Sequence, residues 1–175
     1  MVRFLVLGWC LLTSTFSQAL DLHNTLYEKI GMEIGIDPLL LYSVSLAESA
    51  YAVPNTRSIA PHPWTLRTDK PLYFKNQEQA EKQLQAILQR TDRVDVGLMQ
   101  INVKWHAHRV TDALTLLNPE TNLRVGATIL KESLKSSPND FEIGIGRFHS
   151  YDPERAKEYG QTVFRIYQDL VTQLD

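Results

Sequence analysis

Apolar residues recur with helical spacing over most of the chain. Between positions 21 and 34 they occupy every fourth residue, at Leu22, Leu26, Ile30 and Ile34, a period that places them on one face of an amphipathic helix. Four later segments have the same kind of spacing, at 76–90, 118–134, 141–150 and 153–174. Asn, Asp or Pro stands at the start of each or just before it, and these residues begin helices. The pattern predicts a mainly α-helical chain.

A different pattern lies on both sides of the 76–90 segment, between positions 54 and 97. Three prolines between positions 54 and 63 exclude a continuous helix. The segments 64–67 and 71–74 can then pair as a short β-hairpin, since both are rich in strand-forming residues and a short polar link joins them. Residues 93–97 alternate and add a third strand, with Val94 and Val96 on one side and Asp95 on the solvent side. The expected fold class is therefore mainly α with a small β-hairpin or sheet.

One nearly uncharged helix contains the most informative side chain. Asp37-Pro38 is a helix start, because the Asp side chain caps free backbone donors and proline loses no hydrogen bond at the first position. The helix should run from Pro38 to about Ala50, and its only charge is Glu48, on an apolar stripe with Val44. Burial would raise the pKa of this carboxyl and suit it to general acid catalysis. A helix-terminal glutamate that points into water is the simpler interpretation of this segment alone.

The N-terminus has the features of a secretory signal peptide. Arg3 precedes an apolar core at 4–12, and Ser17-Gln18-Ala19 is a small-residue ending. Cleavage after Ala19 would leave one domain at 20–175, and export would place it in the periplasm. No later segment approaches the roughly 20 apolar residues of a membrane span, so no stable membrane insertion is expected.

Composition narrows the expected partners. The chain has a formal charge of −2, and loss of Arg3 with the signal peptide makes it −3, so neither nucleic acid nor an anionic membrane surface is an expected partner. The only cysteine, Cys10, lies in the signal peptide, which excludes a disulfide framework. His106 and His108 would face different ways on a helix, so a shared metal is not expected. The sequence contains no Gly-rich phosphate loop, and no cofactor is expected.

Several motifs in fixed order carry a resemblance to a known family. They are Ala47-Glu48-Ser49, then Gly97-Leu98-Met99-Gln100-Ile101-Asn102, then Asn118-Pro119 with Asn122-Leu123 and Gly126-Ala127, and finally Arg147-Phe148-His149 with Tyr159 and Val163. Together they resemble the soluble lytic transglycosylases, relatives of goose-type lysozyme. The resemblance spans about 39–163 and implies a lysozyme-like α+β fold with its small sheet near an active-site cleft.

The resemblance implies a peptidoglycan enzyme with a single essential glutamate. Family members cleave the bond between N-acetylmuramic acid and N-acetylglucosamine, and by similarity Glu48 would be the catalytic residue that yields a 1,6-anhydro product. The resemblance assigns substrate binding to the following residues: Ser58, Gly97, Leu98, Met99, Gln100, Asn102, Phe148, His149 and Tyr159. Met99 and Gln100 would contact the acetamido sugars. Apart from the resemblance, aromatic residues such as Trp64 and Trp105 are more often core residues than sugar platforms, and Trp64, in a polar loop, is the best platform candidate.

Two departures from the family pattern leave a second interpretation open. The family's usual serine is replaced by Arg57, with Ser58 one position further, and its usual Tyr-Asn pair is Phe148-His149 here. A non-catalytic periplasmic protein that binds glycan or an assembly partner on the same fold is the alternative. The short, single-domain build also resembles family members that open the cell wall locally for conjugation, secretion or pilus machines, which would then be partners.

Overall fold

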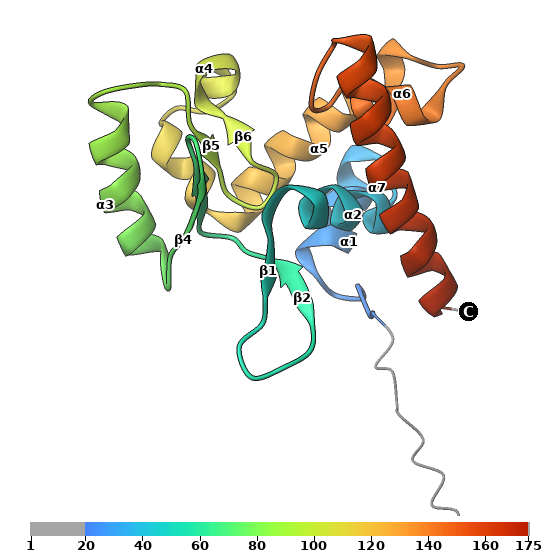
Figure 1. Cartoon of the computed structure of the whole chain (residues 1–175), viewed down its shortest axis with the longest axis horizontal. Helices are drawn as coiled ribbons and strands as arrows, with labels where there is room; N and C mark the ends of the chain where they lie inside the picture. Colours follow the sequence, from blue (N-terminus) through green and yellow to red (C-terminus); the bar gives the residue numbers. More distant parts are fainter. Residues whose placement is uncertain (1–19, 175) are drawn as a thin grey trace, which may run out of the picture.

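The computed structural model describes residues 20–174, and the predicted signal peptide lies outside the described residues. The described part is mainly helical, which confirms the expected fold class (Figure 1). Its α-helices are α1 (Leu26–Ile34), α2 (Pro38–Ser49), α3 (Gln77–Leu88), α4 (Val103–His106), α5 (Pro119–Ser136), α6 (Phe141–Gly146) and α7 (Pro153–Leu174). Two 3-10 helices, η1 (Ala107–Arg109) and η2 (Ala113–Leu117), link α4 to α5.

Most helices begin at the residues that the sequence predicts. The Asp37 carboxylate accepts a hydrogen bond of 2.8 Å from the Leu39 amide at the start of α2, and Asn118 caps α5 through the Thr121 amide at 3.1 Å. Helix α1 begins later than predicted, because Thr25 is its N-cap. Gly35 ends α1 in the left-handed conformation, with φ 76°, which glycine adopts without steric cost.

The strands form two small antiparallel sheets. β1 (Ala50–Ala52) and β2 (Ile59–Pro61) make a hairpin that was not predicted. The second sheet has the order β4-β3-β5-β6, from β3 (Thr65–Arg67), β4 (Pro71–Tyr73), β5 (Asp95–Val96) and β6 (Ile101–Asn102), and confirms the predicted hairpin. Its register places Arg67 opposite Asp95 and Asp95 opposite Asn102. Directly paired residues share a face of a sheet, so these three polar side chains form one row.

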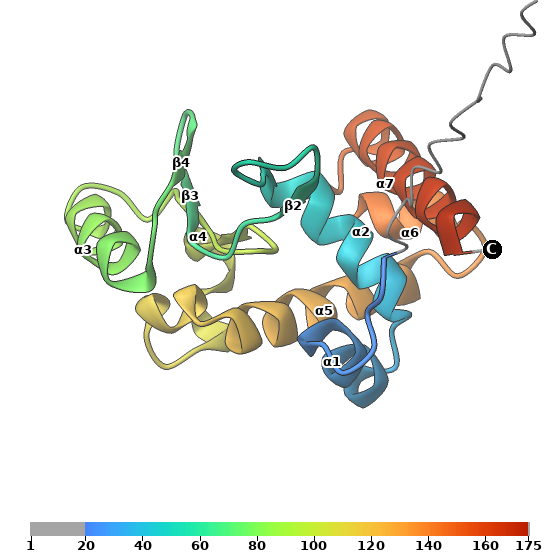
Figure 2. The same ribbon diagram turned by 90° about the horizontal axis from the view of Figure 1, so that it is seen from below.

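Helix α2 lies inside the protein, as its apolar surface predicts. It packs against α1 and α7, and Figure 2 shows it between the lobe of α3 and the strands and the lobe of α6 and α7. Its residues Leu41 and Val44 are fully buried. In the range 20–174 no single helix is long and apolar enough to cross a membrane; α1 and α2 pass that test only as a pair, with a bend of 117° between them.

Candidate active site

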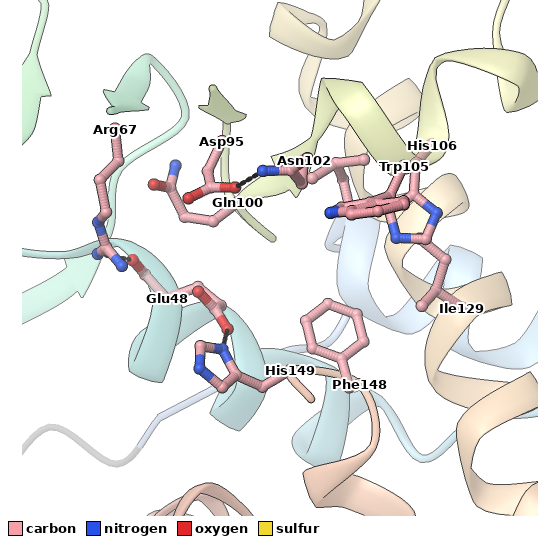
Figure 3. Close-up of a pocket in the computed structure, with 11 residues that line it drawn as sticks. Glu48, Arg67, Asp95, Gln100, Asn102, Trp105, His106, Ile129, Phe148 and His149 are labelled. Atoms are coloured by element: carbon pink, nitrogen blue, oxygen red, sulfur yellow. Dashed lines mark hydrogen bonds and ion pairs between the residues drawn. The ribbon is translucent and has the colours of Figure 1, made fainter. Parts of the chain in front are cut away.

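A cavity of about 220 Å³ opens where the end of α2 meets the row of polar residues on the sheet. Side chains from α2, β3, β5, β6, α4, α5 and the link between α6 and α7 surround it, as the close-up shows (Figure 3). The residues that line it are Glu48, Arg67, Asp95, Gln100, Ile101, Asn102, Trp105, His106, Ile129, Phe148 and His149.

Glu48 is the most buried carboxyl in this cavity. Only 7% of the residue is exposed, and the Tyr159 hydroxyl donates a hydrogen bond of 2.6 Å to its Oε1 atom. Burial raises the pKa of Glu48 to about 7, while the Tyr159 hydrogen bond and the Arg67 charge act in the opposite direction. The predicted desolvation of this carboxyl is confirmed. A carboxyl with this pKa holds its proton near neutrality and can donate it as a general acid.

The helix that carries Tyr159, α7, packs very closely against α6. A Cβ atom at Gly160 would lie 2.0 Å from the Glu142 carbonyl oxygen, and one at Gly146 would lie 1.8 Å from the Ala156 carbonyl oxygen. Only glycine permits this approach of α6 and α7. Burial and the neighbouring Glu48 raise the pKa of Tyr159 far above its ordinary value, so its hydroxyl stays protonated and remains a donor.

His149 completes this side of the cavity. Its ring stacks on Tyr159 with a centroid separation of 4.7 Å and an interplanar angle of 5°, and its Nδ1 atom lies 4.0 Å from Oε1 of Glu48. Burial lowers the pKa of His149, which favours a neutral ring near pH 7. His149 therefore contributes shape and polarity beside the acid without a fixed charge.

The structure contradicts the predicted solvent position of Asp95. Val94 and Val96 are fully buried on one side of the strand, as expected, but the opposite side faces the cavity. The Asn102 amide donates a hydrogen bond of 2.7 Å to the Asp95 carboxylate, and burial raises the pKa of Asp95. The predicted alternation of buried valines and Asp95 is correct. The surroundings of the Asp95 side of the strand are set by α2 and His149, which are distant in the sequence. The cavity thus contains a second carboxyl.

Five residues of the Gly97 to Asn102 segment were expected to bind sugar, and three of them belong to the core instead. Gly97, Leu98 and Met99 are buried and do not line the cavity, and Met99 has no exposed surface, so the predicted Met99 contact with acetamido sugars is wrong. The Gly97 conformation, with φ 79°, turns the chain inward, and a Cβ atom there would lie 2.3 Å from the Asn122 amide nitrogen. The first half of the segment therefore packs in the core, and only later residues of the segment line the cavity.

Gln100 and Asn102 are the members of this segment's predicted set that line the cavity. The Gln100 amide nitrogen donates to the carbonyl oxygens of Gly97, at 2.8 Å, and Thr65, at 3.2 Å. Asn122 supports the same turn from α5: its amide donates to the Val96 and Leu116 carbonyls at 2.8 Å each, and its oxygen accepts from the Met99 amide at 2.8 Å. This buried network holds the polar ends of the segment at the cavity.

Two other predicted residues lie away from the cavity. Ser58 is exposed on the β1–β2 hairpin and does not line it, so the predicted contact with substrate at this site is not supported. Trp64 packs against the hydrophobic core, so of its two interpretations the structure supports the core residue and not the sugar platform. Phe148, His149 and Tyr159 are brought together with Glu48, as predicted.

Besides Asp95, sequence reasoning missed five residues that line the cavity: Arg67, Ile101, Trp105, His106 and Ile129. The Arg67 guanidinium donates a hydrogen bond of 2.9 Å to the Glu48 carbonyl oxygen and so joins β3 to the end of α2. A correct register for the predicted strands would have placed Arg67 beside Asp95. Within residues 20–174, no group of three His, Cys, Asp or Glu side chains is arranged to hold a metal ion.

The fold is the mainly α, lysozyme-like fold with a buried acid at its cleft. A family model described as "Transglycosylase SLT domain" matches residues 26–151. The match covers well over half of the chain, and the chain belongs to this family. Comparisons with curated proteins and with solved structures found no match. The family supports an activity of the lytic transglycosylase type on peptidoglycan.

Proposed function

We propose that the chain is a lytic transglycosylase that cleaves the β-1,4 bond between N-acetylmuramic acid and N-acetylglucosamine in peptidoglycan. Family membership supports this class of activity. One observation carries the assignment to this chain: Glu48 lies at the wall of a cavity, and burial raises the pKa of its carboxyl to about 7. Such a group is protonated when it meets the substrate and ionised after it has given up the proton.

The proposed reaction uses Glu48 twice. Glu48 first gives its proton to the glycosidic oxygen, so that the bond to the muramic anomeric carbon breaks and the N-acetylglucosamine side leaves with a free hydroxyl. The muramic C6 hydroxyl then attacks the same carbon, and the Glu48 carboxylate takes its proton. A 1,6-anhydro ring forms, no water is consumed, and Glu48 ends protonated as it began.

The nucleophile in this reaction belongs to the substrate. An attacking hydroxyl on the reacting sugar has the high effective concentration of an intramolecular group, and a second carboxylate is then not needed to hold water. The Tyr159 hydroxyl, 2.6 Å from Oε1, orients the Glu48 carboxyl and stabilises its ionised form during the first step.

Asp95 supports a second candidate function. Glycosidases that use water commonly pair two carboxyl groups, and Asp95 lines the same cavity as Glu48. A lysozyme-like hydrolase would use Glu48 as the acid and Asp95 to hold or activate the water. The two functions share the substrate and the acid but differ in the product, which has a reducing end only after hydrolysis.

We also propose that the protein works in the periplasm, where peptidoglycan is accessible, and that it opens the wall locally for an envelope-spanning conjugation, secretion or pilus machine. The predicted signal peptide supports export. The association with a machine rests on analogy with similar family members, an argument from likeness rather than from a site.

The assignment of Glu48 can be tested by a zymogram of purified protein on peptidoglycan. Glu48→Gln keeps the shape of the side chain and the acceptor for Tyr159 but removes the proton, so clearing should fall about 10²–10⁴-fold. Glu154→Gln, the same change at an exposed position at the start of α7, is the control and should clear normally. If Glu48→Gln cleared peptidoglycan as fast as the parent, Glu48 would not be the acid.

A further inference from the structure

Trp105 is unusually exposed for a residue beside an active-site cavity. It lies on α4, lines the cavity that contains Glu48, and has 66% of its surface exposed. Trp64, in comparison, packs against the core. Tryptophan buries a large apolar area when it packs, so leaving most of Trp105 in water forgoes that stabilisation. A partner that covers the ring would recover it.

The surroundings of Trp105 combine apolar walls with unused polar atoms. Ile129 and Phe148 line the same cavity. In the described part of the chain, Oδ1 of Asn102 and Nδ1 of His106 are buried but have no hydrogen-bond partner. Because the Asn102 nitrogen already donates to Asp95, its oxygen is free to accept. Buried polar atoms are nearly always satisfied, so a ligand with its own donors and acceptors would complete the hydrogen bonding of these two atoms.

A sugar ring has both kinds of surface. One face of a pyranose presents C–H bonds that pack on an aromatic ring, and its edge carries hydroxyl and acetamido groups that hydrogen-bond to buried polar atoms. The Lys104 ammonium lies 5.1 Å from the centroid of the Trp105 ring and is exposed, so this cation can move aside or share the ring with a ligand. The arrangement fits a neutral, ring-shaped, polar-edged ligand.

We propose that Trp105 forms a sugar-binding subsite in which one pyranose ring of the glycan strand stacks on the indole, while Asn102 and His106 bind its polar groups. Figure 3 shows Trp105 and Arg67 at opposite sides of the site, with Glu48 and Asp95 between them. The subsite therefore holds a sugar of the strand next to the bond that Glu48 would cleave. The choice of ligand rests on the proposed function, and the stacking role rests on the geometry.

The test measures glycan binding without turnover. The Glu48→Gln protein is titrated with soluble, peptide-free peptidoglycan glycan strands, and tryptophan emission is followed. Stacking removes Trp105 from water, so emission should shift to the blue as the strands bind. With Trp105→Leu added, the dissociation constant should rise at least about fivefold, the effect of one lost stacking contact, and the shift should vanish. Trp105→Phe keeps an aromatic ring and should stay within about threefold of the Glu48→Gln protein.

Met32→Ala serves as the control for nonspecific adhesion, because Met32 is 75% exposed and lies on α1. It should bind strands like the Glu48→Gln protein. Equal binding by the Trp105→Leu and Trp105→Phe proteins, or saturation of the Glu48→Gln protein without an emission shift, would overturn the proposal. The emission shift of the Glu48→Gln protein needs no Trp105 variant, so a folding defect of such a variant cannot affect it.

Product analysis of the unmodified protein separates this proposal from the proposed function. Glycan binding that depends on Trp105, together with no cleavage by the unmodified protein, would refute the proposed function and leave the subsite in place. Normal cleavage with strand binding that is indifferent to Trp105→Leu would refute the subsite alone.

Discussion

Replacing Glu48 with glutamine should stabilise the protein at alkaline pH and leave its stability nearly unchanged at acidic pH. Burial raises the pKa of this carboxyl from 4.5 to about 7 in the folded protein. In the unfolded chain the carboxyl loses its proton near its ordinary pKa, while the folded protein keeps the proton until about pH 7. The free energy of unfolding therefore falls as pH rises through this window, and the loss is complete above it.

The magnitude follows from the width of that window. One pH unit corresponds to about 1.4 kcal/mol, so the interval from 4.5 to about 7 corresponds to about 3 kcal/mol of lost stability. Glutamine is neutral at every pH and keeps an oxygen to accept from Tyr159, so the variant avoids this loss. For a domain of this size, 3 kcal/mol is about 6–12 °C in melting temperature.

Urea unfolding followed by circular dichroism at pH 4 and pH 8.5 measures the effect. The difference in unfolding free energy between Glu48→Gln and the parent should be near zero at pH 4 and rise by about 3 kcal/mol by pH 8.5. Glu154→Gln, the same change at an exposed position, is measured beside it as the control for the substitution itself. The same Glu48→Gln difference at both pH values would refute the argument that burial raises the pKa of Glu48.

Cleavage should decline as pH rises through about 7, because ionised Glu48 has no proton to give; constant activity up to pH 9 would refute this link. Tyr159→Phe removes a hydrogen bond that favours the ionised Glu48 carboxyl, so the alkaline limb of the pH profile should move to higher pH. The control, Tyr167→Phe, loses an equally short bond of 2.6 Å to Asp37 and should not move this limb. Asp95→Asn removes a negative charge that raises the pKa of Glu48, so the alkaline limb should move to lower pH with cleavage retained; complete loss of cleavage would favour the hydrolase.

Local signals predicted much of the fold. The helix starts at Asp37-Pro38 and Asn118-Pro119 depend on side chains that cap the adjacent backbone, and the structure places both as expected. The burial of Glu48 was also predictable in part, because its apolar neighbours lie on the same helix. These features are local, so a short stretch of sequence contains the atoms that decide them.

The composition of the cavity wall was less predictable, since it depends on contacts between distant segments. Met99 is an adaptable apolar side chain that could have lined a glycan site, but it packs into the core, where Gly126 leaves room for it. Asp95 alternates as predicted, yet the side it faces is covered by elements far along the chain. Trp105 gave no sequence signal, because the exposure of an aromatic ring is set by tertiary structure.

Mass spectrometry of peptidoglycan digested by the purified protein tests the central claim most directly. If Glu48 catalyses attack by the muramic C6 hydroxyl, the new muramic ends should be lighter by one water than hydrolytic ends and should resist borohydride reduction. The Glu48→Gln protein should produce neither kind of end. Predominantly reducing muramic ends from the parent would contradict the transglycosylase mechanism. They would assign the activation of water to a second carboxyl, and Asp95 lines the same cavity as Glu48.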